Sequence, residues 1–236
     1  MPNNYFQFKQ FTIHQDDCAM KVCTDSCLFG AYIATNYFDY KNILDIGTGT
    51  GLLSLMLAQK TIAQIDAVEI DDKAFLQAQE NFNNSPWKER VNIFNADINL
   101  FKPEKKYDFI ISNPPFFEDD LRSENKEKNT AKHDTDLTLK KLLEIIAENL
   151  SDKGKAALLL PYSRSNDLLK FVKTADLFIH ELVSVKQTPK HNYFRVMAIL
   201  GKEELKQIKK TIVIKDEDNQ YTTDFVELLK DYYLHL

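Results

Sequence analysis

The fold of this chain is decided by the stretch Asn42-Ile-Leu-Asp-Ile-Gly-Thr-Gly-Thr-Gly-Leu-Leu-Ser-Leu-Met-Leu-Ala58. A short apolar run leads into three closely spaced glycines and then into an apolar segment free of Gly and Pro, which predicts a strand, a turn and a helix. Gly47, Gly49 and Gly51 let the backbone approach a ligand closely, and the helix that follows offers free N–H groups at its positive end. These residues predict a loop that binds a nucleotide-type cofactor.

The cofactor is expected to carry adenosine without being NAD. The dinucleotide fingerprint needs a further glycine where this chain has Leu52, so the pattern is Gly-x-Gly-x-Gly and NAD is disfavoured. A second strand over 64–70 contains Glu69 near its end, where it can accept both hydroxyls of a ribose, and a third strand over 91–97 ends in Asp97, which can accept from an adenine amino group. Either acid alone reads as a solvated loop carboxylate, but their common placement after strands favours ligand binding.

Residues 107–117, Tyr-Asp-Phe-Ile-Ile-Ser-Asn-Pro-Pro-Phe-Phe, place a turn directly after an apolar strand. The amino group of a base or an amide is a poor nucleophile, because its lone pair is delocalised. The side-chain oxygen of Asn113 and the carbonyl of Pro114 can accept its two N–H donors and aim the lone pair, and Phe116 offers a flat face for stacking. The alternative is that Asn-Pro-Pro merely closes a strand.

These motifs, taken in order, resemble the S-adenosylmethionine-dependent methyltransferases of the doubly wound class. The resemblance implies that the cofactor contacts Asp45, Gly47, Gly49, Gly51, Glu69, Asp97 and Asn113. Its Asn-Pro-Pro-aromatic subgroup contains adenine-N6 methyltransferases, guanine-N2 ribosomal RNA methyltransferases and glutamine-N5 methyltransferases of release factors. The turn alone does not choose among these substrates.

The N-terminal stretch 6–25 is similar to one family, the tRNA (adenine-N6) methyltransferases that modify the adenosine 3′ of the anticodon in a valine tRNA. The resemblance extends through 79–87 and 108–116 and reappears over 219–234.

For the Thr24-Asp25 pair the resemblance implies contact with the methionine end of the cofactor. Asp25 can accept from its ammonium, and Thr24 and Lys21 can meet its carboxylate. Cys23 and Ser26 depart from the small residues, often glycine, that the resemblance leads us to expect there. Capping of a helix that starts at Ser26 is the structural alternative for Thr24 or Asp25.

The 236 residues, 44% of them hydrophobic, suit one domain, which we expect to comprise an N-terminal cofactor and substrate segment (1–40), a Rossmann-like core (41–201) and a C-terminal appendage (202–236). With no apolar run long enough to span a bilayer and no signal-type N-terminus, a cytoplasmic protein without a membrane partner is expected. Cys18, Cys23 and Cys27 have neither zinc-type nor cluster-type spacing, so we expect free thiols and no metal.

Helical and strand patterns alternate along the chain, which predicts an α/β fold with a doubly wound, mostly parallel sheet. The methyltransferase resemblance implies seven strands, and the β-rich runs at 178–187 and 193–201 suggest a hairpin with an antiparallel edge strand. Helices are expected at 50–60, 71–84, 137–150 and 163–175, strands at 43–47, 64–69, 91–96, 107–112 and 155–160, and an appendage with a strand at 211–214 and a helix at 222–233.

Basic residues gather in the C-terminal third of an acidic chain. Residues 186–215 carry eight Lys or Arg against two Glu, a net +6, which leaves −11 on the rest of a chain whose total is −5. This polarisation favours a phosphate-binding face, although a solvated surface explains it as well. The expected RNA contacts are Lys186, Lys190, His191, Tyr193 and Arg195. The charged segment 118–136 is predicted to be a loop that acts as a lid, as an RNA-gripping arm or only as a solvated surface.

The sequence therefore predicts methyl transfer from S-adenosylmethionine to adenine N6 in tRNA, with Asn113, Pro114 and Phe116 at the reacting base. Guanine-N2 methylation of ribosomal RNA and glutamine-N5 methylation of a protein remain alternatives, although the latter would need a docking domain for which only the first 40 or so residues are available. A non-catalytic cofactor-binding module is disfavoured by the complete set of motifs. The sequence does not specify the oligomeric state, and a monomer is expected.

Overall fold

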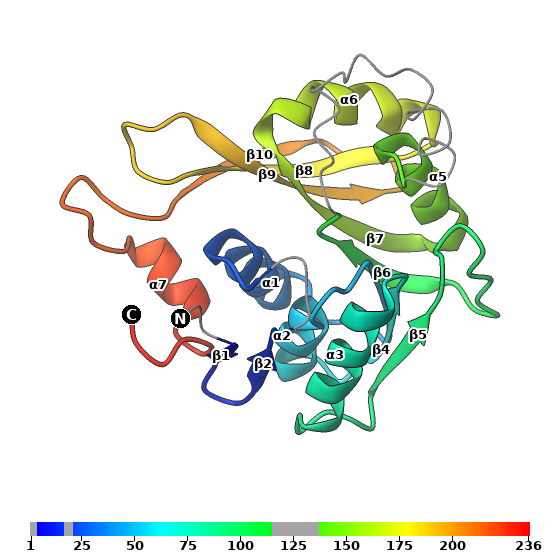
Figure 1. Cartoon of the computed structure of the whole chain (residues 1–236). Helices are drawn as coiled ribbons and strands as arrows, with labels where there is room; N and C mark the ends of the chain where they lie inside the picture. Colours follow the sequence, from blue (N-terminus) through cyan, green and yellow to red (C-terminus); the bar gives the residue numbers. More distant parts are fainter. Residues whose placement is uncertain (1–3, 17–20, 115–136) are drawn as a thin grey trace, which may run out of the picture.

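One large sheet forms the centre of the fold. The computed structural model describes residues 4–16, 21–114 and 137–236. The strands of the sheet are β3 (Asn42–Ile46), β4 (Gln64–Glu69), β5 (Val91–Asn95), β6 (Tyr107–Ser112), β7 (Leu150–Pro161), β8 (Phe178–Lys186), β9 (Tyr193–Gly201) and β10 (Ile208–Val213). They lie in the order β10-β8-β9-β7-β6-β3-β4-β5 (Figure 1).

The sheet confirms the α/β, doubly wound, mostly parallel architecture. Strands β5, β4, β3, β6 and β7 are mutually parallel, and β9 runs antiparallel to both β7 and β8. Two details differ from the expectation: within the described residues the sheet has eight strands where seven were expected, and the antiparallel strand β9 lies inside the sheet and not at its edge. Strand β10 supplies the additional edge, parallel to β8. Its start was missed because Lys209 and Lys210 interrupt its apolar pattern.

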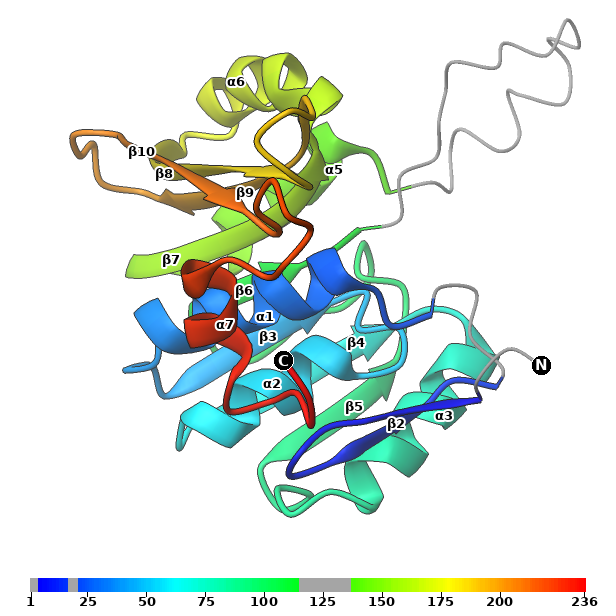
Figure 2. The ribbon, with the colours of Figure 1, turned by 90° about the vertical axis from the view of Figure 1, so that its left-hand side faces the viewer.

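Helices cover both faces of this sheet (Figures 1 and 2). The first core packs the sheet against α1 (Thr24–Asn36), α2 (Leu52–Lys60), α3 (Asp72–Asn83) and α7 (Thr223–Leu229), and the second packs it against α5 (Leu139–Asn149) and α6 (Ser165–Thr174). Neighbouring strand residues alternate between the cores: Ile111 faces the first and Ile110 the second. The four helices expected over 50–175 are confirmed to within two residues at each end.

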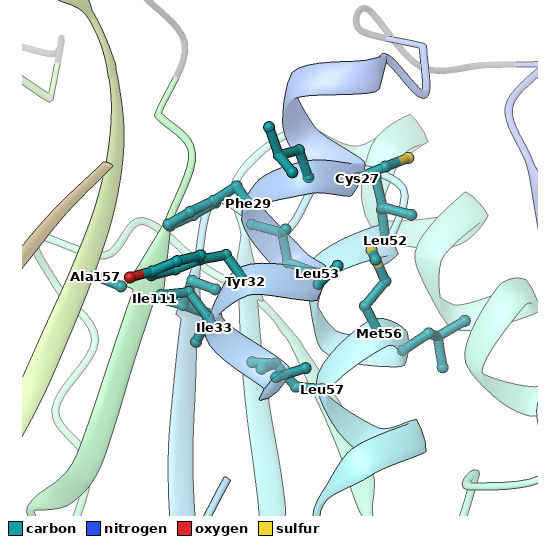
Figure 3. Packing of buried hydrophobic residues seen from close by; sticks show 14 of the residues in the cluster. Cys27, Phe29, Tyr32, Ile33, Leu52, Leu53, Met56, Leu57, Ile111 and Ala157 are labelled. Atoms are coloured by element: carbon teal, nitrogen blue, oxygen red, sulfur yellow. The ribbon is translucent and has the colours of Figure 1, made fainter. Parts of the chain in front are cut away.

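Helix α1 is buried almost along its whole length because it lies between the sheet and α2. Phe29, Tyr32 and Ile33 lie towards the strand residue Ile111 in Figure 3. Gly30 permits the close approach of α2, since a Cβ at this position would lie 2.6 Å from the sulfur of Met56. This packing fixes the start of α1 next to the glycine loop. The helix begins at Thr24, two residues earlier than expected, and Cys23 is its N-cap without a side-chain capping bond.

The N-terminal hairpin and the segment after α7 meet beside α2. Strands β1 (Tyr5–Gln7) and β2 (Thr12–His14) form a small hairpin, and Lys9 lies in the connection between them. The backbone N–H of Lys9 donates to the carbonyl of Tyr232 at 2.8 Å. The hydroxyl of Tyr232 in turn donates to the carbonyl of Met56 at 2.9 Å. These bonds hold the N-terminal hairpin, the segment after α7 and helix α2 together. Within the described residues, no helix is both long and apolar enough to cross a membrane.

Candidate active site

The predicted cofactor residues meet at one edge of the sheet. The glycine loop follows β3, Glu69 is the last residue of β4, Asp97 follows β5 and Asn113 follows β6. These strands are parallel neighbours whose ends are level: Ile46 pairs with Val68 on one side and with Ser112 on the other. Ligands of open α/β sheets bind at this carboxyl edge.

The glycine loop has the shape that a closely approaching ligand needs. Gly47, Gly49 and Gly51 have φ angles of 68°, 58° and 84°, a left-handed region that other residues adopt only with strain. A Cβ at Gly51 would lie 2.3 Å from the ring of Phe82, so this glycine is required by packing. At Gly47 and Gly49 a Cβ would meet nothing within 4 Å, so these two glycines face open space. The loop therefore fits a cofactor that lies against its backbone.

Glu69 holds the loop from the neighbouring strand. Its Oε2 accepts the N–H of Gly49 at 2.8 Å, and its Oε1 accepts the N–H groups of Ile70 at 2.9 Å and Asp71 at 3.0 Å. A carboxylate offers about four acceptor positions, so it retains capacity for a ligand hydroxyl. Asp97 is half-buried, and its Oδ1 accepts from the backbone and side-chain amides of Asn99, both at 2.8 Å. Both acids thus have fixed orientations at the cofactor edge.

Asp45 is fully buried beneath the same loop. Its Oδ2 accepts from the hydroxyls of Thr48 at 2.6 Å and Ser54 at 2.7 Å, which ties the end of β3 to the loop and to α2. Its Oδ1 is buried without a hydrogen-bond partner in the described part of the chain. Burial raises the pKa of this carboxyl to about 6. The hydrogen bonds from the two hydroxyls lower the pKa, but their effect is smaller than that of burial. Asp45 therefore shapes the loop and carries one free acceptor.

The turn after β6 presents Asn113 beside the first turn of α1. Its Nδ2 donates to the hydroxyl oxygen of Ser26 at 2.9 Å, and Ser112 anchors the strand end by donating to the carbonyl of Ile46 at 2.8 Å. Pro114 is buried. The expected stacking residue Phe116 and the segment 118–136 lie outside the described residues, so both expectations stay predictions.

An ion pair at the start of α1 joins Asp25, which was expected to contact the cofactor, to Arg195, which was expected to contact RNA. The Nε of Arg195, on β9, donates to Oδ2 of Asp25 at 2.7 Å. Oδ1 of Asp25 accepts the N–H of Ser26 at 3.1 Å. Lys21 and Thr24 are exposed. Arg195 therefore fixes Asp25 next to the site, and sequence analysis did not reveal this pair because 170 positions separate its members.

The other expected RNA contacts gather where β8 ends and β9 begins. The Nζ of Lys186 lies 4.8 Å from the ring centroid of Tyr193, whose ring is 4.9 Å from that of Tyr162. Tyr162 follows β7 at the carboxyl edge and is 39% exposed, and the sequence analysis missed it. An exposed aromatic residue directly after a parallel strand was the signal that could have found it.

His191 and Lys190 lie on the turn between these strands. Nδ1 of His191 lies 2.7 Å from the hydroxyl oxygen of Thr188, and Lys190 lies 3.7 Å from the carboxylate of Glu217 with its side chain 74% exposed. Such an exposed ion pair contributes little to stability and exchanges readily for another anion. Lys190 is thus accessible to a phosphate.

The cysteines are free thiols where the structure describes them. Cys27 is buried, which raises the pKa of its thiol to about 12, and Cys23 is half-buried at the start of α1. Cys18 lies outside the described residues. In the described ranges no group of three or more His, Cys, Asp or Glu is arranged to hold a metal ion.

Comparison with known proteins identifies the family of this chain. Residues 19–158 match the model of the methyltransferase small domain. A tRNA1(Val) (adenine(37)-N6)-methyltransferase of Cytophaga hutchinsonii is 41% identical over the full length of both chains. The Haemophilus influenzae protein of the same name is 44% identical over 97% of this chain and 98% of its own.

Solved structures with low sequence identity share the fold. A predicted O-methyltransferase from Agrobacterium tumefaciens superposes with a TM-score of 0.65 at 14% identity, over 87% of this chain and 95% of its own. The glycopeptide N-methyltransferase MtfA, solved in complex with (S)-adenosyl-L-methionine, gives a TM-score of 0.58 at 10% identity, over 76% of this chain and 95% of its own. Together with the full-length relatives, these findings show that the chain belongs to the family of the tRNA1(Val) (adenine(37)-N6)-methyltransferases.

Proposed function

We propose that this protein transfers a methyl group from S-adenosylmethionine to N6 of the adenine at position 37 of a valine tRNA, the reaction in the names of its relatives. The observation that carries the proposal is the place of Asn113, directly after β6 and at the carboxyl edge that also holds the glycine loop. A planar amino group bound there would lie beside the cofactor. Because tRNA is the substrate, we expect the protein to act in the cytoplasm.

The residues present fit S-adenosylmethionine. Gly47 and Gly49 leave open space above the loop, Glu69 retains acceptor capacity for the ribose, and Asp97 can accept from the adenine amino group. Asp25, held by Arg195, offers its carboxylate to the ammonium of the methionine end. The bound cofactor would supply a methyl group on a positively charged sulfonium sulfur, which departs as the neutral thioether of S-adenosylhomocysteine.

The catalytic work of the protein is orientation and electrostatic stabilisation. Oδ1 of Asn113 and the carbonyl of Pro114 accept the two N–H donors of the adenine amino group, which localises the nitrogen lone pair. Positive charge develops on this nitrogen as the methyl group is transferred, and the two acceptors stabilise it. The nitrogen becomes acidic at that point, so no side-chain base is required.

The aromatic and basic residues at the β8–β9 end suit an anticodon loop. Bases there are unpaired and are recognised by stacking, while the backbone is recognised by charge. Tyr162 and Tyr193 offer rings for stacking, and Lys186 and Lys190 offer cations for phosphates. This surface lies at the same sheet edge as Asn113, since Pro161 on β7 pairs with Arg195 on β9.

A methylation assay with tritiated S-adenosylmethionine tests the proposal. The purified protein is offered total tRNA, ribosomal RNA and a release factor, and the labelled product is digested and identified. N6-methyladenosine in tRNA is expected. Label in 2-methylguanosine or in a glutamine side chain would contradict the proposal and favour another member of the Asn-Pro-Pro-aromatic subgroup.

A further inference from the structure

We infer that Ser26 is a positioning residue for the methyl transfer: its hydroxyl oxygen accepts from Nδ2 of Asn113 and thereby turns Oδ1 of Asn113 towards the target amino group. The inference rests on the proposed function. The supporting contact joins α1 and the turn after β6, two segments 87 positions apart.

The orientation of the Asn113 side chain decides whether it can act. A carboxamide is planar and nearly symmetric in shape, but one end accepts hydrogen bonds and the other donates them. An amino group offers N–H donors, so it needs Oδ1; if Nδ2 faced it, two donors would oppose one another. The side chain therefore needs a partner that holds Nδ2 away from the substrate. Ser26, at 2.9 Å from Nδ2 and 5% exposed, is in that place.

Ser26 has a second neighbour that can take its hydroxyl hydrogen. Its hydroxyl has one hydrogen, and the sulfur of Cys23 lies 3.0 Å from its oxygen. When the hydroxyl donates to this sulfur, its lone pairs remain for Asn113. The backbone N–H of Ser26 is bound by Asp25, which Arg195 anchors. Cys23 and Ser26 are also the two positions where this chain departs from the small residues expected from the resemblance, and here they contact one another.

The first test is kinetic. Ser26→Ala should lower kcat for tRNA methylation about three- to tenfold, the range for one neutral hydrogen bond, with little change in KM for S-adenosylmethionine or tRNA. Ser26→Thr, which keeps the hydroxyl, should retain most of the activity. Thr35→Ala removes an exposed hydroxyl at the far end of the same helix and serves as the matched control.

A double-mutant cycle separates positioning from general support of the fold. In the Asn113→Ala background, Ser26→Ala should have no further effect on the residual rate, because the group that it orients is gone. A further loss of the same size would show that the two residues act independently and would overturn the inference. An unchanged kcat in the single Ser26→Ala variant would overturn it as well.

The third readout needs no activity, so it tests the inference even if the substrate is not tRNA. In protein labelled with ¹⁵N-asparagine, the side-chain amide of Asn113, identified by its loss in Asn113→Ala, should exchange its protons more slowly than that of the exposed Asn166. Ser26→Ala should remove this protection. Equal exchange of Asn113 and Asn166 in the wild-type protein would contradict the bond to Ser26. A wild-type enzyme that methylates no tRNA but shows the protection would contradict the proposed function alone.

Discussion

Two roles are proposed for the side chain of Asn113: Nδ2 donates to Ser26 on α1, and Oδ1 is proposed to accept from the target amino group. Asn113→Ala should therefore lower the methylation rate by on the order of 10²–10³, the usual effect of losing one preorganised polar group. Cofactor affinity, measured by calorimetry with S-adenosylhomocysteine, should stay close to that of the wild type. Asn149→Ala is the matched control, because Nδ2 of Asn149 donates to the carbonyl of Ile145 on α5, on the other face of the sheet. Near-normal turnover of Asn113→Ala would show that the turn is structural.

Asp45 makes the stability of the cofactor-free protein depend on pH in an unusual direction. Burial raises the pKa of its carboxyl from 3.8 to about 6, so above pH 6 the folded protein contains a buried charge that the unfolded chain keeps in water. Asp45→Asn keeps an oxygen acceptor for Thr48 and Ser54 and never ionises. The free energy of unfolding of the wild type relative to Asp45→Asn should fall by about 2 kcal/mol as the pH rises from about 4 to 6, and by about 3 kcal/mol over the full titration from below about pH 3 to above about pH 7.

Urea unfolding of both proteins across this pH range measures the effect. Because most other groups titrate equally in the two proteins, their contribution cancels in the difference. A difference that stays constant with pH would show that Asp45 is ionised in the fold at its ordinary pKa, and that its free Oδ1 is solvated.

At the scale of the element, two glycines of the loop between β3 and α2 are needed for different reasons: Gly51 for packing against Phe82, and Gly49 for open space next to the loop. Gly51→Ala should destabilise the fold by about 2–5 kcal/mol. The alanine would have to adopt a strained left-handed backbone conformation, and its methyl group would clash with the ring of Phe82. Gly49→Ala should cost about 1–2 kcal/mol of strain and instead weaken cofactor binding, because its methyl group enters the open space. Urea unfolding and calorimetry with S-adenosylhomocysteine distinguish these outcomes. If Gly49→Ala binds the cofactor as the wild type does, the cofactor lies elsewhere.

The sequence predicted the elements whose signal is local. Strands β3, β4 and β6 are apolar runs, and the glycine spacing marks the loop between β3 and α2. Strand β10 was only partly predicted, because two lysines interrupt its apolar pattern and one of them is paired across the sheet: the Nζ of Lys210 lies 2.7 Å from the carboxylate of buried Glu181. A pattern of apolar residues cannot show that a charged residue will be paired across the sheet.

The candidate site was predictable to a similar extent. The positions of Glu69, Asp97 and Asn113 at the carboxyl edge of the sheet could be predicted, because strand ends are visible in the sequence. Contacts between distant segments, such as Asp25 with Arg195 or Ser26 with Asn113, depend on how α1 packs, and no local pattern records them.

At the scale of the whole molecule, the charge is unevenly distributed along the chain: residues 186–215 have a net charge of +6, and the rest of the chain is acidic. Since Arg195 is engaged by Asp25, the phosphate contacts are expected from Lys186 and Lys190. The double variant Lys186→Ala/Lys190→Ala should bind tRNA more weakly, and its log–log salt dependence should be shallower by about 0.7–0.9 per lysine removed.

The matched control for this measurement is Lys41→Ala/Lys153→Ala, which removes two exposed lysines at the opposite edge of the sheet. Its tRNA affinity and salt slope should equal those of the wild type. The double variant at 186 and 190 should recover much of its rate at high tRNA concentration, because its defect is in binding. An unchanged slope in that variant would place the RNA-binding face elsewhere.

The central claim is that one adenine amino group in tRNA receives the methyl group. The most direct test compares two valine tRNA transcripts that differ only at position 37, adenosine in one and guanosine in the other, each incubated with the protein and labelled S-adenosylmethionine. The account predicts stoichiometric N6-methyladenosine in the first transcript and no label in the second. Equal labelling of both transcripts, or label in any other nucleoside, would contradict it.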